Sequence, residues 1–313
     1  MSLNKYKTYS WLWQYLNVYF LKPFDALNDT VSANILSQLE WPDEIVELGV
    51  GDGIFSFIMH GGKFPLNFDR YLQIDFHNPD IFDTHTKNLF PVTRVPTNPT
   101  VMVAIDARQS HIDKVSEIGF ARHAVCSSYE HLPLSDSSYQ TIFYYIPHGL
   151  KDHSLAIHEA HRVLVPDGTL LLLVYNSSFD NSFLCHRMGN ALTGRMRKFF
   201  LDLDNGRHDE LMQLARTQSE WNTYLNEHGF SVEQVHSGLS TAAWKLYDVQ
   251  TRPMLKPLIK LFNIMPNPIR NTIKFMWMLT WYPILLVCLL ILGAEKSSND
   301  RNTCFLAFQL RKL

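Results

Sequence analysis

The sequence has almost no net charge, with 28 Lys and Arg residues against 30 Asp and Glu residues and a formal charge of −2. Such a balance gives no long-range attraction for polyanions, so we expect no nucleic-acid partner. Internal repeats and low-complexity tracts are also absent. Hydrophobic residues make up 46% of the 313 positions, which is enough to form a sizeable core.

Cysteine is scarce, and no CxxC pair is present. The four cysteines are scattered, at Cys126, Cys185, Cys288 and Cys304. This spacing indicates reduced thiols in a cytosolic chain. Three histidines lie close in sequence, at His153, His158 and His161, but no carboxylate or cysteine completes a metal-ligand set at a specific spacing. We interpret them as surface residues and predict no metal site.

From Trp41 onward, short apolar runs alternate with helical stretches, which is typical of a doubly wound α/β sheet. The expected strands are Glu44 to Leu48, Val101 to Ile105, Ala121 to Cys126, Thr141 to Tyr145, Thr169 to Tyr175, Ser231 to Val235 and Cys304 to Leu310. The clearest helices are Ile54 to His60, Ser110 to Ile118, Ser154 to Val163 and Gln218 to His228, the last two ending in turn signals at Pro166 to Gly168 and at Gly229.

Two segments do not fit a minimal sheet-and-helix plan. Residues 60–100 are rich in Pro, Asn, Asp and Phe and are expected to form a long loop that folds over a site. Residues 252–296 are mainly apolar. The resulting organisation is an N-terminal helical cap (1–40), a core (41–251) containing the loop insertion, an apolar insertion (252–296) and a final strand (297–313).

The strongest chemical signal is the stretch Glu47-Leu48-Gly49-Val50-Gly51-Asp52-Gly53, directly after a strand and before a helix. The three glycines allow a tight turn and let a ligand approach the backbone, while the helix N-terminus offers free N–H groups. A dinucleotide fingerprint needs its third glycine one position later, where this chain has Ile54. The spacing therefore favours adenosylmethionine over a nicotinamide dinucleotide.

This loop resembles that of the class I S-adenosylmethionine-dependent methyltransferases, of the methyltransferase type 11 kind. Three further elements resemble that family in the same order: Leu132 to Tyr139, His158 to Gly168, and Glu220 to Phe230. The resemblance covers roughly two-thirds of the chain. It implies a Rossmann-like, doubly wound sheet of seven strands with the last strand antiparallel, here with an apolar helical insertion between the last two strands, and S-adenosyl-L-methionine as the cofactor.

The resemblance also assigns cofactor-binding residues. Glu47 is expected to meet the methionine amine, and Gly49, Gly51 and Gly53 to line the cofactor chain. An acid at the end of the second strand binds both ribose hydroxyls in that family. Asp75 and Asp106 compete for this role, and we favour Asp106 because a helix and then a strand follow it, whereas a proline-rich loop follows Asp75.

Two positions depart from the family pattern. The acid that contacts adenine is replaced by Ser128, which can hydrogen-bond the amine more weakly, and Tyr129 beside it can lie against the ring. After the fourth strand, Tyr145 is followed by Ile146-Pro147-His148-Gly149 in place of the family's motif. Tyr145 is expected at the cofactor. If proton removal from the acceptor needs a base, His148 is the candidate, the alternative being a solvated loop histidine.

The apolar insertion contains 20 residues without a charge, from Phe275 to Ala294, which matches a bilayer crossing in length. Pro266, Pro268 and Pro283 are expected to break it into pieces. The final strand must rejoin the sheet, but a single crossing would place it on the opposite side of the membrane from the other strands. We therefore expect monotopic or re-entrant association with the cytoplasmic face. The alternative is a buried helix or one covering an apolar acceptor tunnel.

The sequence thus predicts a methyltransferase acting on a small, hydrophobic or lipid-linked acceptor at a membrane surface. Two other functions remain open: a cofactor-binding module that has lost catalysis, suggested by Ser128 and the altered loop after Tyr145, and a nicotinamide-dependent oxidoreductase, disfavoured by Ile54. The sequence gives no indication of the oligomeric state, or of whether oxygen, nitrogen or carbon is methylated.

Overall fold

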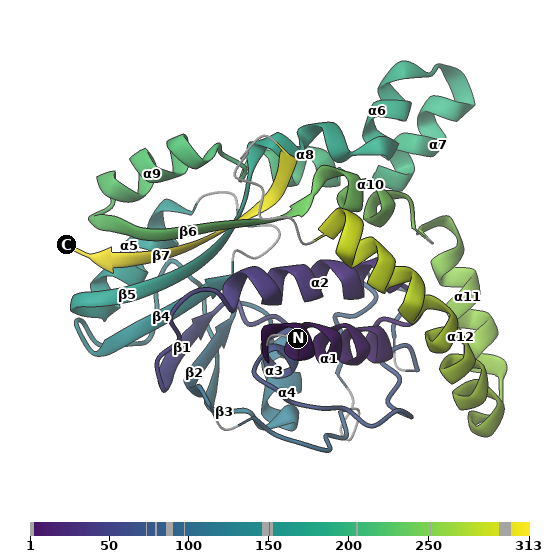
Figure 1. The fold of residues 1–313 in the computed structure, drawn as a ribbon, viewed down its shortest axis with the longest axis horizontal. Helices are drawn as coiled ribbons and strands as arrows, with labels where there is room; N and C mark the ends of the chain where they lie inside the picture. Colours follow the sequence, from purple (N-terminus) through teal and green to yellow (C-terminus); the bar gives the residue numbers. More distant parts are fainter. Residues whose placement is uncertain are drawn as a thin grey trace.

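The computed structural model describes residues 3–72, 74–78, 80–85, 90–96, 98–145, 150, 153–204, 206–250, 252–293 and 302–313. Within these ranges the chain forms a single sheet of seven strands, flanked by helices (Figure 1). Its strands are β1 (Glu44–Leu48), β2 (Thr100–Asp106), β3 (Ala121–Cys126), β4 (Tyr139–Tyr145), β5 (Leu164–Tyr175), β6 (Phe230–Ser240) and β7 (Thr303–Lys312). All seven predicted strands are confirmed.

The strand order is β3-β2-β1-β4-β5-β7-β6. Strands β1 to β5 pair in parallel, and β7 pairs antiparallel with both β5 and β6. The predicted antiparallel last strand is therefore confirmed. Leu170 to Tyr175 of β5 and Cys304 to Leu310 of β7 are buried, because these central strands are covered on both faces.

Twelve α-helices are present in the described residues. Their bounds are α1 (Leu3–Val18), α2 (Pro23–Leu36), α3 (Ile54–Met59), α4 (Gln109–Ile118), α5 (Ser154–Val163), α6 (Leu184–Ala191), α7 (Gly194–Asp204), α8 (Arg207–Met212), α9 (Gln218–Glu227), α10 (Thr241–Val249), α11 (Arg252–Ile264) and α12 (Asn267–Cys288). A 3-10 helix, η1 (Ser177–Ser182), follows β5, and a π-helical turn, η2 (Leu289–Gly293), extends α12.

The predicted helices are confirmed, and local signals explain their ends. Helix α9 begins at a capping box, in which Thr217 and Glu220 bond each other's backbone N–H. The turn residues Pro166 to Gly168 do not simply separate α5 from a strand: α5 ends at Val163, and the three residues form an irregularity inside β5, where the pairing with β4 jumps from Leu164 to Thr169.

One expectation about the histidines of this region is wrong. His153 is buried rather than on the surface, with 2% of its area exposed, because it precedes α5 on the side that faces Trp221 of α9. His161 is half-buried against Phe230. His158 is exposed as predicted.

The described parts of the 60–100 insertion contain one isolated bridge, between Lys63 and Arg94, and otherwise no regular structure before β2. The segment is nevertheless well packed. Phe64 stacks on Phe68 at 4.5 Å between ring centroids, and Phe68 lies 5.4 Å from Phe90. Aromatic burial of this kind anchors a long loop that has few backbone hydrogen bonds.

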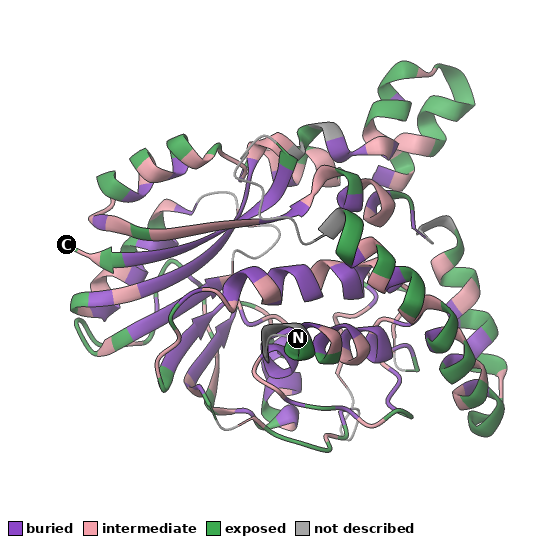
Figure 2. Cartoon of the chain, viewed as in Figure 1, coloured by how far each residue is buried: buried purple, intermediate pink, exposed green. Residues whose placement is uncertain are grey.

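The apolar insertion forms a two-helix arm, α11 and α12, which crosses the ends of the N-terminal helices (Figure 1). Proline breaks the arm only at Pro266, since Pro268 occupies the first turn of α12 and the helix continues through Pro283. The expected break at those two prolines is therefore wrong. In Figure 2 the arm is mainly exposed, whereas the sheet is buried.

Candidate functional site

A cavity of about 260 Å³ opens at the carboxyl ends of the first strands of the sheet. The glycine loop follows β1, Asp106 ends β2, and Tyr145 ends β4, so all three reach the same edge. Parallel strands bring their carboxyl ends together, and ligands in open α/β sheets bind where the order of connections reverses. Here the reversal falls between β1 and β4.

The glycine loop has a left-handed backbone at each glycine, with φ of 72° at Gly49, 58° at Gly51 and 78° at Gly53. The two ends of the loop differ in their surroundings. A Cβ on Gly51 would meet nothing within 4 Å, and this glycine lines the cavity. A Cβ on Gly53 would lie 2.9 Å from the Phe120 ring, so Gly53 permits helix packing rather than lining the cavity as expected.

The Asp106 carboxylate is buried and accepts four hydrogen bonds. Its Oδ2 accepts from the Gly51 N–H and the Tyr129 hydroxyl, and its Oδ1 accepts from the Arg108 N–H and lies 3.0 Å from His111 Nδ1. Burial raises the pKa of Asp106, but the bonds to His111, Arg108 and Tyr129 outweigh it and hold the pKa below its usual value. The carboxylate is therefore ionised at neutral pH and fixed against the glycine loop.

Glu47 lies behind the loop, with 1% of its area exposed. Its Oε1 accepts a hydrogen bond from the Ser56 hydroxyl, whereas its Oε2 has no partner among the described residues. Desolvation raises the pKa of Glu47 to about 8, even though the Ser56 bond lowers it. A buried carboxyl with one unsatisfied oxygen suits a cationic ligand group.

Two sequence-derived candidates lie elsewhere. Asp75, the rejected alternative to Asp106, accepts from the backbone N–H of His77 within the insertion and does not line the cavity. Ser128 is exposed, with its hydroxyl accepting from the Glu130 N–H, and is also absent from the cavity wall, although Tyr129 lines it. His148 lies outside the described residues.

The N-terminal helices supply two side chains that the sequence did not reveal. Tyr19, after α1, and Asp29, in α2, line the same cavity as the glycine loop. Desolvation and the charge of Asp25 raise the pKa of Asp29 to about 8, and a hydrogen bond from Tyr19 lowers it in part. The sequence signal that could have pointed to Asp29 is its position as a carboxylate on the apolar face of α2, between the buried residues Ala26 and Ala33.

Arg70 connects the insertion to the same cavity. Its guanidinium lies 3.0 Å from the Asp52 carboxylate of the glycine loop and packs over the rings of Tyr19 and Phe82, at 4.9 and 4.2 Å from their centroids. A planar guanidinium between two aromatic rings is held in place by cation–π attraction as well as by the ion pair. The insertion therefore contacts both the glycine loop and the residue that follows α1.

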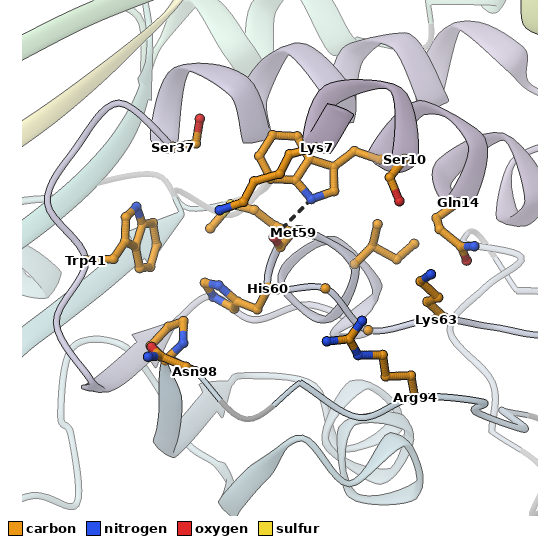
Figure 3. Close-up of a pocket in the computed structure, with 15 residues that line it drawn as sticks. Lys7, Ser10, Gln14, Ser37, Trp41, Met59, His60, Lys63, Arg94 and Asn98 are labelled. Carbon is orange, nitrogen blue, oxygen red and sulfur yellow. Dashed lines mark hydrogen bonds between the residues drawn. The ribbon is translucent and has the colours of Figure 1, made fainter. Parts of the chain in front are cut away.

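A second cavity, of about 450 Å³, is larger but holds none of the glycine-loop residues (Figure 3). Lys7 of α1 and Lys63 and Arg94 of the insertion surround His60 in it, and the Trp11 indole donates to the Met59 carbonyl at 3.0 Å. Size alone therefore does not identify the site. The smaller cavity has the loop, the acids and the strand ends that a nucleotide-like cofactor requires.

Comparison with known proteins gives one family match. The family model described as a methyltransferase domain matches residues 91–172, which run from the end of the insertion through β2, β3, β4 and most of β5. The match begins at residue 91 and therefore does not include the glycine loop. No curated protein matches this chain.

Solved structures resemble the chain at low sequence identity. An S-adenosylmethionine-dependent methyltransferase from Mesorhizobium loti is 14% identical, with 91% of this chain and 100% of that chain covered and a TM-score of 0.46. The YcgJ protein from Bacillus subtilis is 14% identical, with 91% and 96% covered and a TM-score of 0.40. The [4+2]-cyclase SpnF is 12% identical, with 92% and 81% covered and a TM-score of 0.44.

The family match, the strand order with an antiparallel β7 and the glycine loop at the end of β1 agree with one another. The chain contains a methyltransferase domain over residues 91–172, and this domain identifies it as an enzyme that uses S-adenosylmethionine as its methyl donor.

Proposed function

We propose that this methyltransferase acts on a small, hydrophobic or lipid-linked acceptor while it is docked on the cytoplasmic face of a membrane through α11 and α12. The observation that carries this proposal is the inverted character of α12. Both of its charged side chains, Arg270 and Lys274, are buried against the protein, whereas the exposed side of the helix is mainly apolar. A helix of an ordinary soluble protein has the opposite arrangement.

The inner face of α12 is fixed by polar contacts. Lys274 and Arg270 are each 1% exposed. The Lys274 ammonium donates to Asn17 Oδ1 of α1 at 2.6 Å, and the Arg270 guanidinium lies 2.6 Å from the Asp69 carboxylate of the insertion. Removing one partner of a buried ion pair is strongly destabilising. These contacts therefore favour a helix that lies on the membrane with its inner face on the enzyme, rather than one that crosses the bilayer.

The outer face of α12 and η2 is apolar and open. Its large exposed hydrophobic side chains are Ile269, Phe275, Met276, Leu279, Ile284, Val287, Leu290 and Ile291. Only 22% of the most apolar window of Asn267–Ile291 is buried, which supports a surface helix over the buried core helix that the sequence left open. An exposed apolar surface of this extent is typical of a membrane contact, and the exposed Lys256 and Lys260 of α11 suit anionic lipid at its edge.

The cavity residues fit the cofactor. Gly51 leaves space for the methionine chain, and Asp106 is placed for the ribose hydroxyls. Glu47 does not line the cavity: its unsatisfied Oε2 is buried behind the glycine loop, and we expect it to meet the methionine ammonium when the cofactor enters. All four acceptor sites of Asp106 are already in use, so a ribose hydroxyl must replace one donor, and the Tyr129 hydroxyl is the side-chain donor able to turn away. When bound, S-adenosylmethionine supplies a methyl group already activated for in-line displacement.

The chain's own contribution is alignment and proton removal. Among the described residues, Asp29 is the cavity carboxylate not bound to the glycine loop, and Tyr19 holds it in place. We assign Asp29 the role of a general base toward the acceptor. It is a second candidate for this role, in addition to the sequence-derived candidate His148. A positive charge brought into the cavity lowers the pKa of Asp29, so that the carboxylate becomes available as a base when the donor is bound.

The test of the acceptor class uses purified enzyme, radiolabelled methyl donor and two extracts of the same cells, one containing lipids in vesicles and one containing water-soluble metabolites. We expect the label to enter the lipid extract. Incorporation into the aqueous fraction alone contradicts the acceptor class without contradicting methyl transfer. A tag placed after Leu313 should be cut by protease in sealed vesicles with the cytosolic side outward, whereas a tag cut only after the vesicles are opened means a true crossing.

A further inference from the structure

The larger of the two cavities, of about 450 Å³, lies at the opposite edge of the sheet from the cofactor cavity. Trp41 and Pro99 of its wall precede β1 and β2, whereas the cofactor cavity opens where those strands end. Helix α3 runs between the two cavities, since the glycine loop leads into it and Met59 and His60 lie at its far end. A group bound here is therefore out of reach of the methyl donor, because reacting atoms must approach to about 3 to 3.5 Å.

Three cations and no carboxylate line this cavity. Lys7 comes from α1, and Lys63 and Arg94 come from the insertion. Each of the three is exposed, and none has an ion-pair partner in the part of the chain that the structure describes. In Figure 3 the Lys7 and Arg94 side chains reach into the cavity from opposite sides. Asp43 is not part of the wall, and its carboxylate accepts from the Asn98 amide at 3.2 Å.

Backbone pairing holds Lys63 and Arg94 directly opposite each other. Their isolated antiparallel bridge has both hydrogen bonds, from the Lys63 N–H to the Arg94 carbonyl at 3.0 Å and from the Arg94 N–H to the Lys63 carbonyl at 3.4 Å. Residues paired in this way have Cα atoms about 5.5 Å apart and side chains on the same face. Like charges at such positions destabilise the pairing. An anion bound between the two side chains removes this repulsion.

The other polar groups of the wall also suit an anion. Gln14 Oε1 accepts from the Phe64 N–H at 3.3 Å, which leaves the amide N–H groups of Gln14 as donors on the cavity wall. The last four carbonyls of α3, from Ser56 to Met59, would repel an anion, but each of them accepts a hydrogen bond from a later N–H group or from the Trp11 indole. His60 is neutral, because burial lowers its pKa to about 3.

Two indoles give the cavity an apolar side. The Trp11 N–H donates to the Met59 carbonyl at 3.0 Å, and the Trp41 N–H donates to the Leu36 carbonyl at 2.8 Å. Since both N–H groups are used, the rings offer an occupant only apolar surface. An inorganic ion alone would leave this surface uncovered. The volume lies within the range of about 300 to 1,000 Å³ that is usual for small-molecule sites.

We propose that this cavity binds a small organic phosphate, with the phosphate group held by Lys7, Lys63 and Arg94 and the apolar part against Trp11 and Trp41. A phosphate monoester carries about two negative charges at neutral pH, which three cations can neutralise. The Arg94 guanidinium can bind it through two parallel hydrogen bonds, and the lysines act as point charges. The bound phosphate would tie α1 to the insertion.

The experiment is a calorimetric titration of the full chain with phenyl phosphate. We expect one phenyl phosphate per chain, bound more tightly than inorganic phosphate and more weakly as salt increases. Lys63→Gln/Arg94→Gln should weaken binding about 100-fold or more, since each lost hydrogen bond to a charged group corresponds to about 10- to 100-fold. Without the probe, this variant should keep its thermal midpoint, because the repulsion across the bridge is removed. Gly51→Asp, which blocks the cofactor cavity, should bind phenyl phosphate as the unaltered chain does.

The matched control is Arg195→Gln/Lys198→Gln, which removes two exposed cations of α7 and the same net charge, and should leave binding unchanged. Phosphatidylcholine vesicles containing phosphatidic acid distinguish the two sources of the phosphate. Competition between these vesicles and phenyl phosphate identifies a lipid headgroup, and binding without competition identifies a free ester. The proposal is overturned if the unaltered chain binds no stoichiometric phenyl phosphate, if inorganic phosphate binds as tightly, or if Lys63→Gln/Arg94→Gln binds phenyl phosphate as tightly as the control.

Discussion

The membrane contact predicts a large effect from a small change on the outer face of α12. Leu279 and Val287 are 46% and 53% exposed and make no hydrogen bonds through their side chains, so Leu279→Gln/Val287→Gln should leave the fold unchanged. Complete burial of such a side chain is worth about 1.5 to 3 kcal/mol. With about half of each side chain available to the bilayer, the double variant should lose roughly 2 kcal/mol, or about 30-fold in vesicle partitioning.

The assay is co-sedimentation with phosphatidylcholine vesicles containing a fraction of anionic lipid, at physiological salt. Leu155→Gln/Val95→Gln is the matched control, since these residues are 49% and 40% exposed on α5 and in the insertion. Apolar burial is not screened by salt, so binding of the unaltered enzyme should largely survive high salt. If the α12 variant and the control lose equal amounts of binding, or neither loses any, the outer face of α12 is not the membrane contact.

Four further predictions concern the cofactor cavity. Gly51→Asp should abolish cofactor binding in calorimetry with only a small change in thermal midpoint, whereas Gly53→Val, forced against Phe120, should lower the midpoint clearly; the reverse pattern would contradict the geometry of the loop. Asp106→Ala should weaken cofactor binding by about 1.5 to 3 kcal/mol, while Tyr129→Phe, which keeps the ring and frees an acceptor site, should change the Kd by only a few-fold; equal losses would mean that the hydroxyl itself binds the cofactor. Asp29→Asn should lower kcat by about 10²- to 10⁴-fold with the cofactor Kd nearly constant. It should also remove the rise in activity with pH that deprotonation of Asp29 produces in the unaltered enzyme. A parallel loss of cofactor affinity would make Asp29 a cofactor ligand instead. Because burial raises the pKa of Glu47 and of Asp29 to about 8, cofactor binding at pH 7 should release protons from both carboxyl groups as they ionise near the bound cation. Glu47→Gln should remove the Glu47 share of this release and Asp29→Asn the remainder, as measured by calorimetry in buffers of different ionisation enthalpy.

Local pattern was sufficient for the strands and for the glycine turn that follows β1. All seven strands were predicted because each is a short apolar run bounded by turn residues, and the glycine loop was identified because its backbone requires left-handed conformations that only glycine adopts freely. Asp106 was separated from Asp75 by the same means, since a strand is recognisable by the helix that follows it. In the structure Asp106 lies in the cavity and Asp75 does not.

Local pattern also misled where the surroundings of a residue decided its role. Gly53 belongs to the glycine motif, but its missing side chain makes room for Phe120, which lies far along the chain. Ser128 stands at the position of a cofactor contact, yet the backbone turns it outward while Tyr129 enters the cavity. Neither outcome has a signal in the neighbouring residues, because both depend on how β3 and α4 pack.

The sequence by itself therefore determined the order of strands and helices, the cofactor loop and the existence of an apolar insertion, because these depend on periodicity and backbone preference over a few residues. Only the tertiary structure placed Asp29 in the same cavity as the glycine loop, turned Lys274 and Arg270 of α12 inward, and brought Lys7 into one cavity with Lys63 and Arg94. Each of these depends on contacts between segments distant in the chain, and packing rather than local preference selects which face of a helix is covered.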